Sequence, residues 1–246
     1  MSVRLSEIFT SIEGEGIYFG TKSMFVRFAG CPLKCHWCDT TYALPFESGD
    51  AVPIEKAKEL VESSLAPNTF KVNFTGGEPL SQHEALIELS KHVRSLGLRT
   101  YLESACYDSR RFESVLPFID ICKIEFKLSD SRVVAPENYS NLLRNELECL
   151  DAALSHHRSA SAGSPAKVVY VKVVVSSESS LDEFERLVQL IFETDNAGSL
   201  AGFIIQPTHK IAEPSLDRLV KFYDAVFPYC PDVRVIPQLH KILGAR

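Results

Sequence analysis

Short runs of β-branched and aromatic residues alternate with longer amphipathic runs along this chain. The short runs predict strands at 23–28, 71–75, 98–103, 119–126, 167–175, 202–206 and 233–237. Helical spacing of apolar residues predicts a helix from Pro53, a second from Ser81 with Glu84 completing a capping box, and others near 137–157, 180–195 and 214–228. Repeated strand–helix–strand units require right-handed crossovers and a parallel sheet. We therefore predict an α/β fold. Six to seven parallel strands are too few for a complete eight-stranded barrel, which indicates a partial TIM-type barrel with helices outside.

The chain is expected to form one domain over residues 1–246. Its 246 residues, 45% of them hydrophobic, can build one sizeable core, and neither an internal repeat nor a domain linker is evident. Segment 155–165 is the one low-complexity stretch, and its small polar residues predict a mobile surface loop. The adjacent His156 and His157 in it could bind a metal, but solvated loop residues are the favoured interpretation.

Composition excludes some partners. A formal net charge of −6 gives no support to binding of nucleic acid or acidic membranes. The first residues lack the apolar core of a signal peptide, and no apolar run reaches the roughly 18 residues of a membrane span. Seven cysteines, an odd number, argue for reduced thiols. These features predict a cytoplasmic protein.

Three cysteines, Cys31, Cys35 and Cys38, form a C-x3-C-x2-C motif directly after the first predicted strand. A closed zinc site normally takes four protein ligands, whereas an iron–sulfur cluster held by three thiolates keeps one iron open. A zinc site completed by His36 or a distant residue remains an alternative, as do three buried thiols. No second metal-binding pair exists among the other cysteines, which we expect to be buried and structural: Cys106, Cys122, Cys149 and Cys230.

Further polar motifs follow the next strands. They are the run 75–79, the pair Glu103 and Ser104, and Lys127. In parallel α/β folds ligands gather beyond the carboxyl ends of the strands, so these motifs and the cysteine loop can share one site. Two adjacent glycines in the run 75–79 let the backbone approach a ligand closely, and Glu78 suits an ammonium group. An ordinary β–α turn is the alternative interpretation of the run.

The cysteine motif together with Thr75-Gly76-Gly77-Glu78-Pro79 resembles the radical S-adenosylmethionine enzymes. The resemblance implies a 4Fe-4S cluster on the three cysteines, whose open iron chelates the methionine moiety and whose reduction yields a 5′-deoxyadenosyl radical. Trp37 resembles the aromatic residue near adenine, although a core aromatic is an equal alternative. The implied S-adenosylmethionine contacts are Trp37, Gly76, Gly77, Glu78, Glu103, Ser104 and Lys127. The family motifs Thr-Asn-Gly and Ser-Pro-Lys are replaced here by Glu103-Ser104-Ala105 and Glu125-Phe126-Lys127, in which Glu103 and Lys127 keep the positions.

Both ends of the chain narrow this resemblance. The segments 7–16, 25–31, 38–40 and 234–244 are similar to the 7-carboxy-7-deazaguanine synthase (QueE) family. That similarity implies conversion of 6-carboxy-5,6,7,8-tetrahydropterin to 7-carboxy-7-deazaguanine and ammonia, on the route to queuosine or archaeosine in tRNA. The implied radical abstracts hydrogen from C6 and later returns it, so that S-adenosylmethionine acts catalytically. The similarity also implies that segments 1–22 and 232–246 contribute to the active site. It further implies an external electron donor such as flavodoxin or ferredoxin, and a homodimer.

The chemistry of the matched residues suits such a substrate. Glu13 and Glu15 can accept hydrogen bonds from the guanidine-like edge of a pterin, and Arg27 can oppose its carboxylate. The resemblance implies that the hydroxyl of Thr40 coordinates a Mg²⁺ ion shared with that carboxylate, and that His240 contacts substrate. Each residue also has a structural alternative: solvated turn residues, a surface ion pair, a helix cap, or packing of the chain end.

Two other functions share part of this pattern. An activase that generates a glycyl radical on a partner protein has the same cysteine loop and glycine turn, but would not need Glu13, Arg27 or the terminal segment 238–241. A binding protein with a zinc site would explain the cysteines alone.

Overall fold

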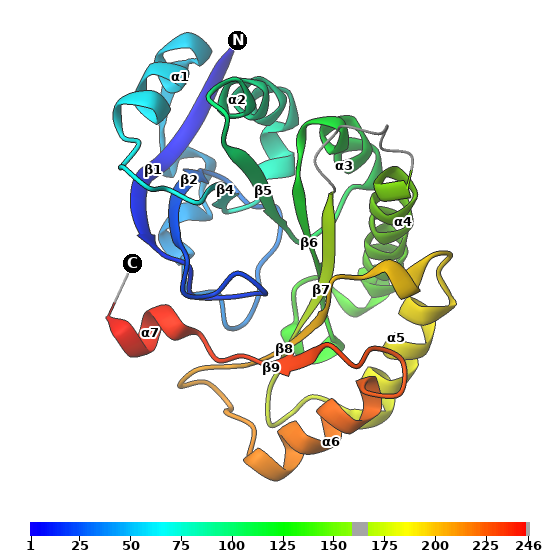
Figure 1. The fold of residues 1–246 in the computed structure, drawn as a ribbon. Helices are drawn as coiled ribbons and strands as arrows, with labels where there is room; N and C mark the ends of the chain where they lie inside the picture. The colour runs from blue at the N-terminus through cyan, green and yellow to red at the C-terminus, as the bar shows by residue number, and fades with distance from the viewer. Residues whose placement is uncertain (159–166, 245–246) are drawn as a thin grey trace.

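The computed structural model describes residues 1–158 and 167–244, and its centre is one nine-stranded sheet (Figure 1). The strand order is β3-β1-β2-β4-β5-β6-β7-β8-β9. The parallel part consists of β2 (Lys22–Phe28), β4 (Lys71–Gly76), β5 (Arg99–Ser104), β6 (Ile121–Phe126), β7 (Val168–Val175), β8 (Phe203–Pro207) and β9 (Val233–Val235). Two antiparallel strands, β1 (Ser2–Ile12) and β3 (Asp50–Pro53), extend one edge. Because β3 and β9 lie at opposite edges, the curved sheet is an open, partial barrel, and the predicted α/β fold is confirmed.

Helices cover the outer face of the sheet (Figure 1). They are α1 (Ile54–Ser63), α2 (His83–Ser95), α3 (Ser109–Val115), α4 (Tyr139–Arg158), α5 (Leu181–Glu193) and α6 (Leu216–Val226). The main apolar core lies between these helices and the outward side chains of the strands, such as Cys122, Ile124 and Phe126 of β6. Burying each large apolar side chain contributes roughly 1.5–3 kcal/mol, so this layer supplies most of the driving force for folding. No helix in the described part of the chain is long and apolar enough to cross a membrane.

A second, smaller apolar cluster closes the amino end of the barrel. Its buried residues come from the inner faces of the parallel strands and the C-terminal segment: Tyr101, Ile121, Tyr170, Ile204 and Ile236. The hydroxyl groups of Tyr101 and Tyr170 are hydrogen bonded to each other. The loop after β1 packs Ile17 and Tyr18 against this floor. Within the described part of the chain, apolar side chains thus fill this end of the barrel interior.

Some predicted local features were wrong. Helix α2 begins at His83, not at a Ser81 cap, because Pro79 starts a 3-10 turn, η3 (Pro79–Gln82), that is capped by the side chain of Glu78. Residues 155–158 form the last turn of α4 rather than a loop, and residues 159–165 of the predicted loop lie outside the described part. The sequence patterns also missed β1, β3, α3 and the C-terminal α7 (Leu239–Leu243). The last three are short, and short elements show little periodicity.

Candidate active site

A cavity of about 210 Å³ opens at the carboxyl ends of the parallel strands. Every residue that the sequence predicted for the site lines this one cavity: Glu13, Glu15, Arg27, Cys31, Cys35, Trp37, Cys38, Thr40, Gly76, Gly77, Glu78, Glu103, Ser104, Lys127 and His240. They come from the loop after β1, from strand ends between β2 and β6, and from α7. The fold therefore brings together motifs that are more than 200 positions apart in the sequence.

The cysteine loop lies between β2 and the opposite wall of the cavity. The amide of Cys31 donates to the carbonyl of Leu44 at 2.9 Å, and the amide of His36 donates to the carbonyl of Ser131 at 2.9 Å. Burial raises the pKa of the Cys31 thiol to about 12 and also raises that of Cys35. Metal binding releases such protons, because the thiolate is the ligand. Three soft sulfur donors at one cavity fit a cluster in which each thiolate binds a different iron.

The other four cysteines do not line the cavity. Cys106, Cys122, Cys149 and Cys230 are buried, as predicted. Among the described residues, no three His, Cys, Asp or Glu side chains are grouped closely enough to hold a single metal ion. Trp37 lines the cavity, and its indole nitrogen is buried without a hydrogen-bond partner in the described part of the chain. An unpaired buried donor at a cavity is available to a ligand.

The glycine turn docks on the start of the cysteine loop. A side chain on Gly77 would place Cβ 2.3 Å from the carbonyl oxygen of Gly30, and Gly76, with φ +144°, would place it 2.3 Å from the carbonyl oxygen of Phe28. The amide of Gly77 donates to Phe28 at 3.0 Å, and that of Glu78 to Gly30 at 2.8 Å. These two N–H groups therefore donate to the chain itself. The glycines permit this approach between backbones.

The carboxylate of Glu78 joins the ends of β4 and β5. It accepts hydrogen bonds from the amide of Leu80 at 3.0 Å, the hydroxyl of Ser104 at 2.9 Å and the amide of Ala105 at 2.8 Å. Burial raises the pKa of Glu78, while these donors oppose the rise. Glu78 and Ser104 thus fix each other at the cavity wall.

Glu13 is buried, which rules out the solvated-turn interpretation. One carboxylate oxygen accepts from Lys71 Nζ and from Asn73 Nδ2, both at 2.5 Å. Burial raises the pKa of Glu13, and the positive charge of Lys71 opposes that rise. The contact ties the loop after β1 to the inner face of β4.

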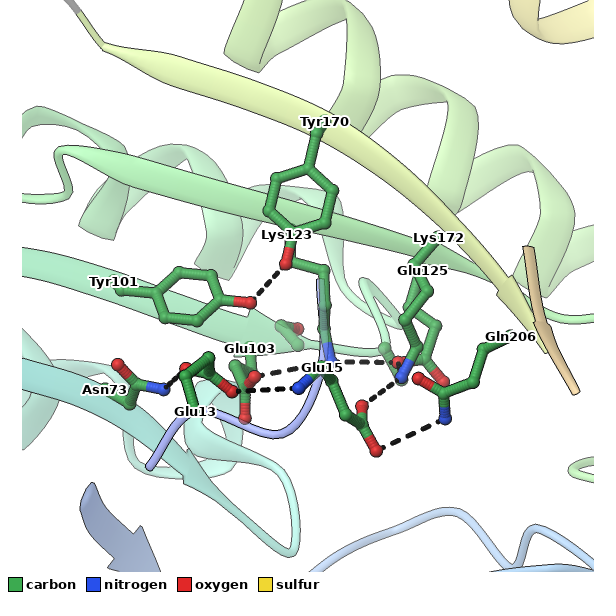
Figure 2. Close-up of polar contacts among 12 residues, drawn as sticks. Glu13, Glu15, Asn73, Tyr101, Glu103, Lys123, Glu125, Tyr170, Lys172 and Gln206 are labelled. Carbon is green, nitrogen blue, oxygen red and sulfur yellow. Dashed lines mark hydrogen bonds and ion pairs between the residues drawn. The ribbon is translucent and has the colours of Figure 1, made fainter. Parts of the chain in front are cut away.

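Glu15 is bound to the opposite side of the barrel (Figure 2). Lys172 Nζ of β7 lies 2.5 Å from one carboxylate oxygen, while the amide groups of Gln206 and Gln238 donate to the other at 3.2 Å and 3.0 Å. Burial alone would raise the pKa of Glu15, but Lys172 and Lys123 lower it to about 2. The carboxylate is therefore ionised at neutral pH.

Arg27 projects from β2 into the cavity and into an adjoining one of about 430 Å³. Its Nε donates to Glu7 at 2.8 Å, and its guanidinium carbon lies 5.7 Å from the ring centroid of Phe9 and 6.0 Å from that of Tyr42. The two rings and the carboxylate hold the planar cation in one orientation.

Thr40 also lines both cavities. Its hydroxyl lies 3.8 Å from the sulfur of Cys38 and makes no capping hydrogen bond to the following turn, η1 (Thr41–Ala43). Thr40 thus occupies the N-cap position of this turn, but its side chain does not cap it.

His240 contacts the cysteine loop through Asp39, a residue that the sequence did not single out. Asp39 Oδ2 lies 3.5 Å from His240 Nε2, 3.1 Å from Lys241 Nζ and 3.3 Å from Gln238 Nε2. The amide of Leu239 also donates to the carbonyl of Gly14 at 2.9 Å. The C-terminal segment thus bridges the cysteine loop and the loop after β1.

Four further polar residues in the cavity wall were missed: Lys123, Glu125, Lys172 and Gln206. Lys127 belongs with them, since it pairs with Glu125. Although burial would lower the pKa of Lys127, the neighbouring Cys35 and Glu125 raise it. The sequence contained a pattern that could have identified them, because the charged residues 123, 125 and 127 alternate along a strand and so share one face.

The chain is similar to known proteins along its whole length. The model of the 4Fe-4S single cluster domain family matches residues 12–134. The 7-carboxy-7-deazaguanine synthase of Methanocaldococcus jannaschii is 30% identical over 254 residues, which cover 98% of this chain and 99% of that protein. The chain belongs to the 7-carboxy-7-deazaguanine synthase family. This family lies within the radical S-adenosylmethionine enzymes, and membership implies a 4Fe-4S cluster and S-adenosylmethionine as cofactors.

Solved structures agree with this family assignment at the level of the fold. QueE from Escherichia coli superposes with a TM-score of 0.66 at 18% identity and covers 98% of this chain and 95% of its own. A domain of a pyruvate-formate lyase-activating enzyme from Bacteroides vulgatus reaches a TM-score of 0.52 at 15% identity but covers only 67% of this chain. QueE therefore matches nearly the whole of this chain, whereas the activating-enzyme domain matches about two thirds of it.

Proposed function

We propose that this family member converts 6-carboxy-5,6,7,8-tetrahydropterin to 7-carboxy-7-deazaguanine with release of ammonia. The observation that carries the proposal is a single cavity with the cysteine loop and glycine turn on one wall, and with Glu13, Glu15 and Arg27 on the others. An activase for a protein substrate has no need of paired carboxylates and an arginine fork at a small-molecule cavity.

The chain offers separate residues for each cofactor. Cys31, Cys35 and Cys38 hold the 4Fe-4S cluster. S-adenosylmethionine lies against the glycine turn and contacts a set of residues from neighbouring strand ends: Trp37, Gly76, Gly77, Glu78, Glu103, Ser104 and Lys127. When bound, the cluster and S-adenosylmethionine supply the radical chemistry, which is abstraction of a hydrogen atom from the substrate. The apolar floor at the amino end of the barrel helps to exclude water from this site.

The substrate is oriented by charge at its two ends. Glu13 and Glu15 accept hydrogen bonds from the aminopyrimidine edge of the pterin, and Arg27 binds the carboxylate at the other end. The hydroxyl of Thr40 contributes to a Mg²⁺ site shared with that carboxylate, in which water completes the coordination. His240 covers the substrate from the C-terminal side, and segments 1–22 and 232–246 thereby belong to the active site of one domain.

The test is an anaerobic assay of the reconstituted holoenzyme with the pterin, S-adenosylmethionine, Mg²⁺ and a reductant. We expect 7-carboxy-7-deazaguanine and ammonia in equal amounts, and no product from a Cys31→Ala variant. An intact cluster that cleaves S-adenosylmethionine without forming deazaguanine would contradict the proposal. Omission of Mg²⁺ tests the metal separately, and we expect the KM for the pterin to rise about tenfold without it.

The proposal extends to two partners. An external one-electron donor such as flavodoxin or ferredoxin reduces the cluster, and the active species is a homodimer. Replacement of a chemical reductant by purified flavodoxin or ferredoxin, and light scattering of the holoenzyme, test these two statements independently of the product assay.

A further inference from the structure

A row of alternating charges crosses the inner face of the barrel (Figure 2), and its residues line the cavity. Lys123 lies 3.8 Å from Glu103 and 3.0 Å from Glu125, while Lys172 lies 3.2 Å from Glu125 and 2.5 Å from Glu15. Glu103 and Lys123 are register partners on β5 and β6, and Glu125 and Lys172 are register partners on β6 and β7. The sheet register itself therefore fixes the order of the charges.

Lys172 is the link between this row and the loop after β1. Its side chain is only 4% exposed, compared with 11% for Glu125 and 17% for Glu15. A buried ammonium group is stable only when it is paired and hydrogen bonded. Among the described residues, the ion-pair partners of Lys172 are Glu125 and Glu15. Glu15 is the end of the row that is most exposed to the cavity.

The neighbourhood of Glu15 is prepared for a donor-rich ligand. Gln206 is 3% exposed, donates its amide to Glu15, and leaves its own Oε1 buried without a partner in the described part of the chain. Glu15 and Gln206 both line the cavity. Buried acceptors without donors are costly, and a bound ligand with several N–H groups removes that cost.

We propose that Lys172, braced by Glu125 on the neighbouring strand, is a positioning residue that holds Glu15 at the cavity wall for the donor-rich edge of the substrate. The nature of that substrate rests on the proposed function. Lys172 acts through Glu15 and need not touch the ligand. Without this cation Glu15 keeps only amide donors, and its desolvated charge is no longer compensated by an ion pair, so the carboxylate turns away or takes up a proton. Either change removes an acceptor from the wall.

A double-mutant cycle on the reconstituted holoenzyme tests the inference. Binding is followed by the fluorescence of 6-carboxypterin, an aromatic analogue of the substrate, and KM and kcat by formation of deazaguanine. We expect Lys172→Met to raise Kd and KM about tenfold with a much smaller change in kcat. Cleavage of S-adenosylmethionine without pterin and the cluster absorbance should stay at the wild-type level. Glu15→Gln should give a similar rise, and the double variant should be no worse than Glu15→Gln alone.

Lys167→Met is the matched control. Lys167 is also a buried lysine, immediately precedes the same strand, donates to the carbonyl of Leu116, and is absent from the cavity wall. In the double variant with Glu15→Gln, the factor by which Lys167→Met changes Kd should be the same as in the wild type, as expected for two independent changes. If Lys172→Met does not fold, Glu125→Gln removes the brace instead, and we expect it to raise Kd about threefold.

The outcomes separate the two proposals. A wild-type enzyme that makes deazaguanine, together with a Lys172→Met variant of unchanged Kd or with independent effects of Lys172 and Glu15, overturns the inference alone. A wild-type holoenzyme that neither binds the pterin analogue nor forms product overturns the proposed function and the inference with it.

Discussion

The amide of Glu78 donates to the carbonyl of Gly30 at 2.8 Å, so the glycine turn is fastened to the residue immediately before Cys31. The bonded residues, Gly30 and Glu78, are more than 40 positions apart in the sequence, and the two motifs thus form one structural unit. A displacement of either one moves the other. In the proposed holoenzyme, backbone hydrogen bonds and not flexible side chains would set the spacing between the two motifs.

Gly77→Ala tests this unit. The added Cβ would lie 2.3 Å from the carbonyl oxygen of Gly30 and 2.9 Å from that of Ala43, and neither backbone group can turn aside. We expect a loss of about 1–3 kcal/mol in the free energy of unfolding and a loss of S-adenosylmethionine binding of at least tenfold. Urea unfolding and equilibrium dialysis measure the two effects. Gly198→Ala, where nothing lies within 4 Å of the added carbon, is the control. Wild-type binding by Gly77→Ala would contradict the account.

The ion pair between Glu13 and Lys71 should be required for folding stability. Both side chains are almost fully buried, at 2% and 0% exposed, and the N–O distance is 2.5 Å. Glu13→Gln leaves a buried ammonium without its anion, so we expect a loss of about 3 kcal/mol in the free energy of unfolding. Adding Lys71→Met should recover much of that loss, because it removes the uncompensated charge. Urea unfolding measures both variants.

Lys56→Met provides the contrast for that experiment. The Lys56–Glu59 pair is 57% and 67% exposed at 2.9 Å, and we expect its loss to change the free energy of unfolding by less than about 0.5 kcal/mol. If Glu13→Gln proved as mild as Lys56→Met, the buried pair would not stabilise the fold in the way proposed.

Sequence patterns predicted the parallel strands and the site better than they predicted the connections between site residues. The seven predicted parallel strands were recognisable because periodicity is a local property, and the cavity residues because their motifs resemble those of a known family. The attachment of Glu13 to Lys71, of Glu15 to Lys172, and of His240 to Asp39 depends on long-range contacts that no local pattern contains.

The stability of the protein should fall in acid partly through Glu15. Its pKa is lowered from 4.5 to about 2, so the ionised form is favoured by folding. A carboxyl group of this kind contributes stability that is fully present above the unfolded pKa and is lost as pH falls from about 4.5 toward 2. After allowance for its partial exposure, the contribution is on the order of 2 kcal/mol. Urea unfolding of the cluster-free protein between pH 5 and pH 2 should show a steeper loss for the wild type than for Glu15→Gln, and equal slopes would contradict the assignment.

Gly14 sets the position of His240, and its replacement should alter substrate binding more than stability. An added Cβ on Gly14 would lie 2.2 Å from His240 Nδ1, so Gly14→Ala must displace the imidazole from the cavity wall. The ring is the side chain of a C-terminal segment that can shift, which keeps the cost in unfolding free energy to about 1 kcal/mol. We expect the KM for the pterin to rise about tenfold, as in His240→Ala, and the double variant to match His240→Ala because both changes act on one contact. Steady-state kinetics of the three variants measures this, and an effect of Gly14→Ala in a His240→Ala background would show that the glycine acts elsewhere.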